Sequence, residues 1–321
     1  PPPVPPCMIL TVPLFHVTGC VPVMLGSIAT GSRLVMMYKW DAGRALELIE
    51  REKVTNFIGV PTMSHDLLLH PDFDKFDTSS LKNVGGGGAP MAPELVKKIE
   101  STFAEKGKAT PQLGYGLTET NGYGPGNTGP DYVSHPSSTG RAVPIMDVRV
   151  VRNDGVGTVE VPVGEVGEVE LRGPMLIRGY WHRPDATAES IVDGWLRTGD
   201  LGYLDEEGFL YIVDRIKDMV LRGGENVYCS EVEAAIYEFP GVREVAVFGL
   251  PHERLGEEVV AAVVPTEGTL DLTALEAFLA QRIAAFMIPS QWFVHDSELP
   301  RGATGKILKR EIRDRILADR A

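Results

Sequence analysis

The first stretch that could do chemistry is YGLTET, which spans Tyr115–Thr120. Gly114 and Gly116 would let the backbone approach a flat ligand closely, because neither residue carries a side chain. The Thr118 hydroxyl could bond a phosphate oxygen, and Glu119 offers hard oxygen ligands that suit Mg²⁺. An ordinary strand-to-helix turn with a capping threonine would use the same residues. The motif alone therefore leaves both interpretations open.

Two later stretches carry charged groups beside glycines. In GWLRTGDLG, Gly194–Gly202, the Asp200 carboxylate could accept hydrogen bonds from both hydroxyls of a ribose. A turn aspartate that bonds its own backbone is the commoner role for such a residue. In the stretch Asp214–Glu233, Arg215 could bond the same ribose or a phosphate. The side-chain-free pair Gly223–Gly224 could let a thin ligand pass, or the stretch could simply be a charged hairpin.

Two single basic side chains complete the candidate chemistry. Lys306 lies in LPRGATGKILKRE and follows Gly302 and Gly305, so a mobile loop could carry its ammonium onto a phosphate. A solvated basic start of a helix explains the same residues. His16 lies in PLFHVTG beside an apolar run, where a lone histidine is more often part of a core.

The elements before these motifs alternate between strand and helix patterns. We expect a helix from Asp41 to about Lys53, a strand over Thr55–Val60, a helix over Pro61–Leu69, a strand over Leu81–Val84 that ends in a glycine run, a helix from Pro93, and a strand over Ala109–Leu113. This alternation predicts a parallel sheet covered by helices. Ligands in such sheets bind beyond the C-terminal strand ends, where we expect both glycine-bearing loops.

The pattern changes twice further along. From Asp147, short strands and turns indicate a small antiparallel, barrel-like section. After about Lys217, Ser230 and Glu233 form a capping-box pattern before a short helix. The expected remainder is strands over Val242–Gly249 and Val259–Pro265, a helix near Leu272–Ala284, a strand over Trp292–His295 and a helix after Thr304. We therefore predict a large α/β domain over 1–216 and a small α+β domain over 217–321.

Composition limits the classes of partner. Lys and Arg total 31 and Asp and Glu total 44, giving a net charge of −13. This excess of acid argues against a general nucleic-acid or anionic-membrane surface. The run Val17–Thr30 is interrupted and shorter than a membrane span, so we expect no integral membrane segment. The cysteines Cys7, Cys20 and Cys229 are odd in number without metal-ligand spacing, which favours a reducing compartment, the cytoplasm.

The order of the motifs is more specific than any one of them. GGGGAP, YGLTE, WLRTGD, DRIKD and GATGK resemble the core motifs of the adenylate-forming superfamily, which includes acyl-CoA synthetases, firefly luciferase and peptide-synthetase adenylation domains. The resemblance covers essentially the whole chain. RGGENVY with Glu231 and Glu233 is most similar to fatty-acyl and related acyl-CoA synthetases.

The resemblance implies a nucleotide site for ATP and AMP. The adenine would be framed by Gly88, Ala89, Gly114, Tyr115 and Gly116. Thr118 would hold phosphate and Glu119 would coordinate Mg²⁺. Asp200 would bind the ribose hydroxyls, with Arg215 beside it.

The resemblance also implies moving parts. Lys217 would be the hinge between the two domains, and Lys306 would stabilise the transition state of adenylation. Rotation about the hinge would remove Lys306 and bring in Gly223 and Gly224 beside the pantetheine of coenzyme A. His16 would lie near the acyl pocket and the thioester-forming site.

The implied reaction joins a small-molecule carboxylic acid to CoA through acyl-AMP, with pyrophosphate and AMP released. Two alternatives stay open: an enzyme that loads a carrier-protein thiol, and a nucleotide-binding protein without catalysis. A homodimer is also open. Gly122, Gly124 and Gly126 could shape a roomy pocket floor, but fatty, aryl and sterol-derived acids all remain candidates.

One family motif has no counterpart in the sequence. The family's Ser/Thr/Gly-rich phosphate loop, which ends in Pro-Lys-Gly and lies upstream of the histidine motif, is not matched. We expect this loop to precede residue 1. We therefore expect residues 1–321 alone not to carry out adenylation.

Overall fold

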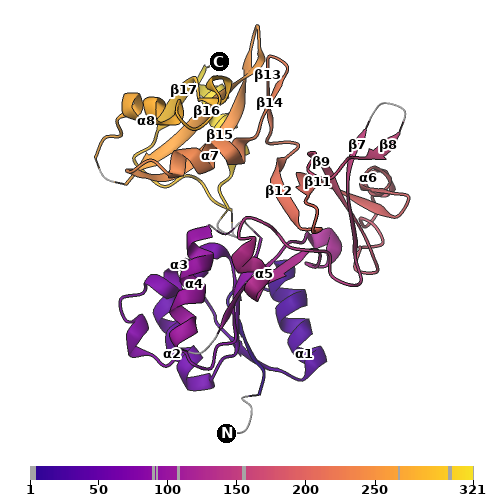
Figure 1. Ribbon diagram of the computed structural model, residues 1–321, viewed down its shortest axis with the longest axis vertical. Helices are drawn as coiled ribbons and strands as arrows, with labels where there is room; N and C mark the ends of the chain where they lie inside the picture. Colours follow the sequence, from indigo (N-terminus) through magenta and orange to yellow (C-terminus); the bar gives the residue numbers. More distant parts are fainter. Residues whose placement is uncertain are drawn as a thin grey trace. The chain divides into compact units, whose positions relative to one another are not determined.

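The computed structural model of the chain divides into two units (Figure 1). It describes residues 5–88, 91, 93–106, 109–153, 157–266, 268–302 and 306–320. The first unit comprises Pro1–Thr198 and Gly202–Ile212, and the second comprises Gly199–Leu201 and Val213–Ala321. The domain boundary expected at Lys217, and its role as a hinge, stay predictions.

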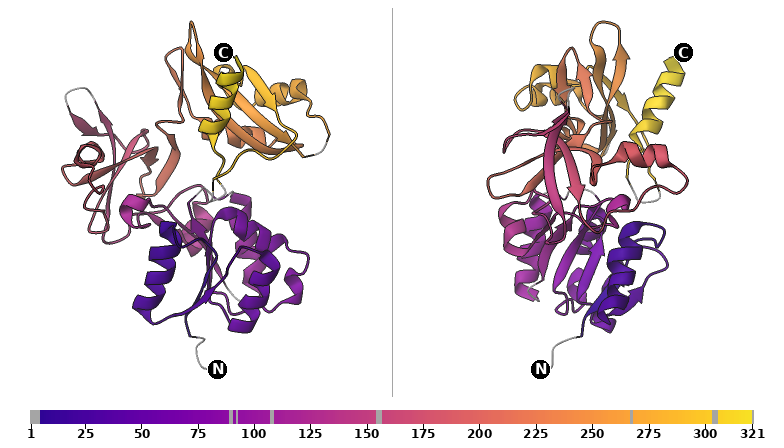
Figure 2. Two further views of the ribbon diagram at one scale, coloured as in Figure 1. Left: turned by 180° about the vertical axis from the view of Figure 1, so that it is seen from behind. Right: turned by 90° about the vertical axis from the view of Figure 1, so that its right-hand side faces the viewer.

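A six-stranded, mainly parallel sheet forms the centre of the first unit, in the order β2-β1-β3-β4-β5-β6. Its strands are β1 (Cys7–Leu10), β2 (Arg33–Met36), β3 (Asn56–Gly59), β4 (Asn83–Gly87), β5 (Thr110–Gly114) and β6 (Gly126–Thr128). Only the pairing of β5 with β6 is antiparallel among these neighbours. Helices α2 (Ala42–Glu52), α3 (Pro61–Leu69) and α4 (Pro93–Lys106) cover one face. The π-helix η1 (Gly19–Leu25) and α1 (Gly26–Thr30) cover the other (Figure 2).

Side-chain alternation along the strands explains this three-layer arrangement. Ile9 and Phe57 are fully buried in the cluster that includes residues of α2, α3 and α4. Their neighbours Leu10 and Ile58 belong to a smaller cluster with Val23 of η1. The strands are thus apolar on both faces, as buried parallel strands are. The predicted α/β fold is confirmed.

The glycine run corrects one expectation. We expected the strand to end at Val84 and the glycines to form a loop, but β4 continues through Gly87. A Cβ atom on Gly85 would lie 1.9 Å from the Gln112 carbonyl oxygen, and one on Gly86 would lie 1.8 Å from the Gly59 carbonyl oxygen. Glycine is therefore required here by the close approach of β3 and β5 on either side of β4. Gly88 alone of the run follows the strand.

The predicted antiparallel section makes up the rest of the first unit, and its last two strands also include residues 199–201 and 213–215 of the second unit. Its strands are β7 (Asp147–Asn153), β8 (Thr158–Glu160), β9 (Gly167–Arg172), β10 (Ile191–Val192), β11 (Trp195–Leu204) and β12 (Leu210–Arg215). Their order is β10-β11-β9-β7-β8, and β12 pairs with β11. Helix α6 (Pro184–Ser190) precedes β10. Met146, Val150, Val169, Leu171 and Leu210 form the core of this section.

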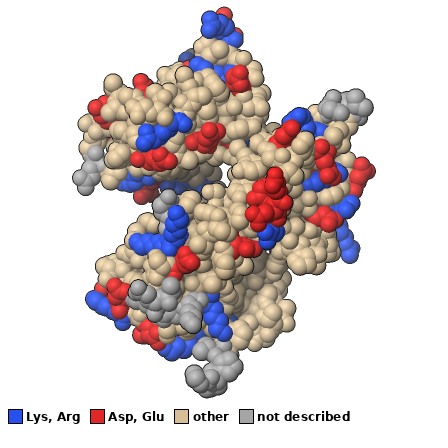
Figure 3. Space-filling model, viewed as in Figure 1, with Lys and Arg blue, Asp and Glu red and all other residues tan. Residues whose placement is uncertain are grey.

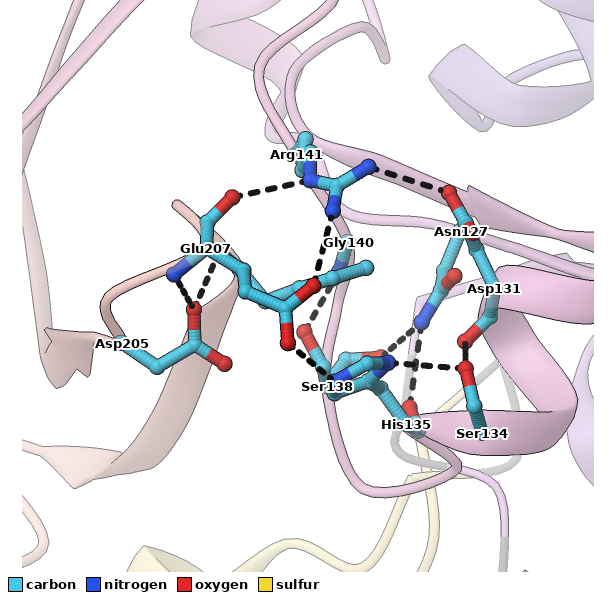
Figure 4. A network of polar contacts seen from close by, with 10 residues as sticks. Asn127, Asp131, Ser134, His135, Ser138, Gly140, Arg141, Asp205 and Glu207 are labelled. Atoms are coloured by element: carbon cyan, nitrogen blue, oxygen red, sulfur yellow. Dashed lines mark hydrogen bonds and ion pairs between the residues drawn. The ribbon is translucent and has the colours of Figure 1, made fainter.

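A polar network joins the turn between β11 and β12 to the parallel-sheet part of the first unit (Figure 4). The Arg141 Nε atom donates to the Glu207 carbonyl at 2.9 Å, and its Nη1 lies 3.2 Å from an Asp131 carboxylate oxygen. Asp131 belongs to α5 (Gly129–Ser134). The Phe209 ring stacks on His135 at 3.9 Å between ring centroids and also contacts the Arg141 guanidinium at 4.0 Å. These contacts fix the antiparallel section against β6 and α5.

The second unit is a small α+β domain, as predicted. Its strands are β13 (Val220–Arg222), β14 (Glu225–Val227), β15 (Val242–His252), β16 (Gly256–Pro265) and β17 (Gln291–Val294). They lie in the order β14-β13-β16-β15, with β17 parallel to β16. Val245 and Val247 pack in one cluster with residues of α7 (Cys229–Tyr237) and α8 (Leu272–Leu279). Ala246 and Phe248 pack in another cluster with Ile312 of α9 (Lys309–Arg320).

The capping box expected at the start of α7 is wrong. The helix begins at Cys229, and its N-cap residue Tyr228 makes no side-chain cap bond. The Glu233 carboxylate instead accepts a hydrogen bond from the Val247 amide at 2.7 Å and lies 2.8 Å from the Lys309 ammonium. Glu233 therefore bonds to groups in β15 and α9 and does not cap its own helix. Helix α8 also ends at Leu279, before the expected Ala284.

Charged side chains of both signs lie on the surface (Figure 3). On the face shown in Figure 3, acidic and basic side chains are intermingled. Within the part of the chain that the structure describes, no helix is both long and apolar enough to cross a membrane. Cys7, Cys20 and Cys229 are free thiols, and burial raises the pKa of Cys7 and Cys229.

The glycine strand gives a stability prediction. Gly86→Ala should lower the free energy of unfolding by about 2–3 kcal/mol, because its Cβ must displace the neighbouring backbone of β3. Urea denaturation measures the change. Gly157→Ala is the matched control, since no atom of the described residues beyond its chain neighbours lies within 4 Å of the added Cβ there, and its effect should stay within about 0.5 kcal/mol. Equal stability of both variants would contradict the packing account.

Candidate active site

A cavity of about 400 Å³ opens in the first unit at the C-terminal ends of β4 and β5. This is the edge at which parallel sheets bind ligands. Four residues predicted to frame the adenine border it: Gly88, Gly114, Tyr115 and Gly116. The fifth, Ala89, lies outside the described residues. Gly122, Gly124 and Gly126, expected to form a pocket floor, border the same cavity.

The glycines around the cavity have two different roles. Among the described residues other than its chain neighbours, the atom nearest to a Cβ on Gly88 or Gly114 would lie 4.0 Å away, so a side chain there would occupy space beside the cavity. A Cβ atom on Gly116 would lie 2.6 Å from the backbone of Gly122, and one on Gly124 would lie 2.5 Å from the Tyr115 carbonyl. Gly88 and Gly114 therefore leave room for a flat ligand. Gly116 and Gly124 allow the loop itself to pack.

Thr118 and Glu119 follow this loop directly, in the 3-10 turn η3 (Thr118–Thr120). The Thr120 hydroxyl accepts from the Leu117 amide at 3.0 Å and so stabilises the turn. Thr118 is exposed and Glu119 is half-buried. The Glu119 Oε1 atom accepts a hydrogen bond from the Tyr180 hydroxyl at 2.8 Å. Tyr180 was not predicted as a site residue, because the sequence gives no local sign of a contact with Glu119.

The Glu119 carboxylate suits a magnesium site in which water and substrate phosphates supply the other ligands. Among the described residues, no three carboxylate, imidazole or thiol groups are gathered to hold a metal ion. Mg²⁺ keeps several water ligands and is commonly held by one or two carboxylates together with substrate phosphates. The Tyr180 hydroxyl donates to one oxygen of Glu119, and the second oxygen is the one that a cation could bind. Glu119 therefore fits that donor set.

His16 lies close in sequence to the cavity wall. It is half-buried, and its Nδ1 atom accepts from the Thr18 amide at 3.3 Å. Its carbonyl oxygen accepts from the Cys20 amide at 3.1 Å. Thr18 and Pro22 border the cavity, and η1 begins at Gly19. The structure thus places His16 in the same unit as the predicted adenine residues.

The second unit brings together three other predicted residues. Asp200 is buried, with 4% of its surface exposed, and its Oδ1 accepts from the Arg215 Nε atom at 3.1 Å. Arg215 and Lys306 border one open groove of about 780 Å³ beside α9. The pKa of Lys306 lies below its ordinary value, because nearby protein atoms reduce hydration of the ammonium and Arg215 repels it, while Asp200 acts in the opposite direction. The three groups are therefore electrostatically coupled.

Lys217 and the two glycines lie on turns of the second unit. Lys217 is exposed, in a turn where the amides of Asp218 and Met219 both donate to the Arg215 carbonyl at 3.0 Å. Gly223 and Gly224 connect β13 to β14 with φ angles of 62° and 95°. Two positive φ angles are typical of a two-residue hairpin turn. The pair thus forms the hairpin considered from the sequence, and its role beside CoA stays a prediction.

Two family models match parts of this chain. The AMP-binding enzyme family matches residues 5–181, and the AMP-binding enzyme C-terminal domain matches residues 231–306. A feruloyl-CoA synthase from Amycolatopsis sp is 39% identical over 312 residues, which is 96% of this chain and 61% of that protein. A long-chain-fatty-acid–CoA ligase from Bacillus subtilis is 38% identical over 305 residues, 94% of this chain and 52% of that protein.

A solved structure of similar fold also matches this chain. The crystal structure of ATP-bound MatB from Rhodopseudomonas palustris superposes with a TM-score of 0.86 at 31% identity, over 97% of this chain and 60% of that chain. The chain thus spans between about half and three-fifths of the length of these proteins. On the match to residues 5–181 and the similarity to these relatives, the chain belongs to the AMP-binding enzymes of the adenylate-forming superfamily, whose members here include CoA ligases.

Proposed function

We propose that the protein activates a carboxylic acid with ATP and transfers the acyl group to coenzyme A. The observation that carries the proposal is the glycine-bordered cavity at the ends of β4 and β5. Its open sides at Gly88 and Gly114 suit a planar purine, and Thr118 and Glu119 follow it along the chain. The names of the relatives, a feruloyl-CoA synthase and a fatty-acid–CoA ligase, support the same reaction.

In the first half-reaction, a carboxylate oxygen of the acid attacks the α-phosphorus of ATP. The bond from that phosphorus to the bridging oxygen breaks, and pyrophosphate leaves with acyl-AMP formed. Bound Mg²⁺ would neutralise part of the phosphate charge at Glu119. The Lys306 ammonium would stabilise the charge that develops on the α-phosphate. Asp200 would hold the ribose hydroxyls, and its buried carboxylate is already oriented by Arg215.

In the second half-reaction, the CoA thiolate attacks the acyl carbon. The bond from that carbon to the phosphate oxygen breaks, and AMP leaves with the thioester formed. We propose that rotation about Lys217 removes Lys306 between the two halves, so that binding and chemistry are gated by domain motion. His16 would lie near the thioester-forming site, as Gly223 and Gly224 would after rotation.

The acid itself is best identified by a direct experiment. The relatives are named for ferulate and for long-chain fatty acids, which are chemically different. A panel of fatty, aryl and sterol-derived acids should be incubated with the full-length protein, ATP, Mg²⁺ and CoA. Acyl-CoA detected by mass spectrometry supports the proposal. Acyl-AMP without acyl-CoA from every acid would instead favour a carrier-protein thiol as acceptor.

Asp200→Ala in the full-length protein tests the ribose assignment. Each lost hydrogen bond to the charged acceptor should cost about 1.5–3 kcal/mol, so AMP affinity should fall at least about tenfold. Titration calorimetry with AMP measures this loss, and thermal unfolding reports the separate effect on stability. An unchanged AMP affinity would show that Asp200 serves only the fold.

Lys306→Ala tests the division of the reaction into two halves. It should slow acyl-AMP formation about a hundredfold to a thousandfold, because a preorganised charge is lost at the α-phosphate. Thioester formation from supplied acyl-AMP should be largely spared, since Lys306 would then be displaced. Arg310→Ala is the control: Arg310 borders the same groove, its side chain is 94% exposed, and both half-reactions should persist.

Lys217→Pro should give the complementary result. Proline fixes φ near about −65° and removes the backbone donor, so rotation about this residue would be blocked. Acyl-AMP formation should survive if the fixed geometry is the adenylating one, and transfer to CoA should fail. The two half-reactions are assayed separately in this variant and in Lys306→Ala. Equal loss of both halves in both variants would rule out domain alternation.

A further inference from the structure

Glu119 is held by a residue far along the chain. The Tyr180 hydroxyl donates to the Glu119 Oε1 atom at 2.8 Å, across 61 positions of sequence. Two more bonds join the same segments. The Ile177 amide donates to the Glu119 carbonyl at 2.8 Å, and the Asn121 side-chain amide donates to the Met175 carbonyl at 2.8 Å. The short turn that carries Glu119 is thus attached to the segment 175–180.

Tyr180 is itself fixed by α6. Its amide donates to the Thr187 hydroxyl oxygen at 2.9 Å, and that hydroxyl donates to the Arg183 carbonyl at 2.8 Å. A Cβ atom on Gly179 would lie 2.8 Å from the Thr187 methyl group, so glycine is needed for α6 to approach. Asp185 forms an ion pair with Arg183 at 3.1 Å. The tyrosine ring therefore projects from a well-supported turn.

The chemistry of the contact suits a metal-binding carboxylate. A neutral phenol orients the carboxylate without cancelling its charge, as a lysine or arginine would. One carboxylate oxygen is engaged, and the other is the oxygen that a cation could bind.

We infer that Tyr180 is a positioning residue for Glu119, which it holds in the orientation that binds the magnesium ion accompanying ATP. The inference rests on the proposed function. It assigns a role to the Gly179–Thr187 stretch, GYWHRPDAT, that its sequence alone did not suggest. Groups that hydrogen-bond a metal-ligating carboxylate typically change metal affinity about tenfold to a hundredfold when removed.

Tyr180→Phe in the full-length protein tests the inference. The Mg²⁺ concentration needed for half-maximal ATP binding, measured by calorimetry without acid, should rise about tenfold. Affinity for AMP without metal should change less than about twofold, because no metal is involved. Tyr211→Phe is the matched control. It removes another tyrosine-carboxylate bond, 3.1 Å from the Tyr211 hydroxyl to Asp205 Oδ2, and should leave the Mg²⁺ dependence unchanged.

A double variant separates positioning from general loss of structure. In the Glu119→Gln background, Tyr180→Phe should add no further change in Mg²⁺ dependence, because the ligand has already been lost. An unchanged Mg²⁺ dependence in Tyr180→Phe alone, or an equal loss of AMP affinity, would overturn the inference. Failure of the wild-type protein to bind ATP at any Mg²⁺ concentration would instead overturn the proposed function.

Discussion

The close approach of β3, β4 and β5 is the constraint on which the proposed site depends. Gly85 and Gly86 leave no room for a Cβ atom between the neighbouring backbones, so the three strands lie tightly together. The carboxyl ends of β4 and β5 then reach the same edge of the sheet, and the cavity opens there. A side chain at Gly85 or Gly86 would separate the strands and move the loop that carries Tyr115 and Gly116.

Long-range hydrogen bonds set the directions of the polar groups. Glu119 sits on a turn too short to fix a side chain by itself, and the segment 175–180 holds both its carbonyl and its carboxylate. Asp200 is buried and oriented by Arg215 in the second unit, where Lys306 borders the same groove as Arg215. In both places a charged group is directed by a partner from another element, which is how preorganised sites retain their geometry.

Local signals in the sequence predicted much of the fold. Asp41 caps α2 through the Arg44 amide, and Pro61 begins α3, because both effects act within one turn of helix. The glycine strand was missed because glycine locally favours loops, whereas its role here comes from neighbouring strands. The false capping box at Glu233 and the missed contact of Tyr180 have the same cause. Their partners lie in distant elements that no local pattern reveals.

The most direct test of the account is a crystal structure of the full-length protein bound to AMP. The account predicts that the purine lies in the cavity beside Gly88 and Gly114, where an added Cβ atom would have open space. A purine bound elsewhere, with this cavity left empty, would contradict it.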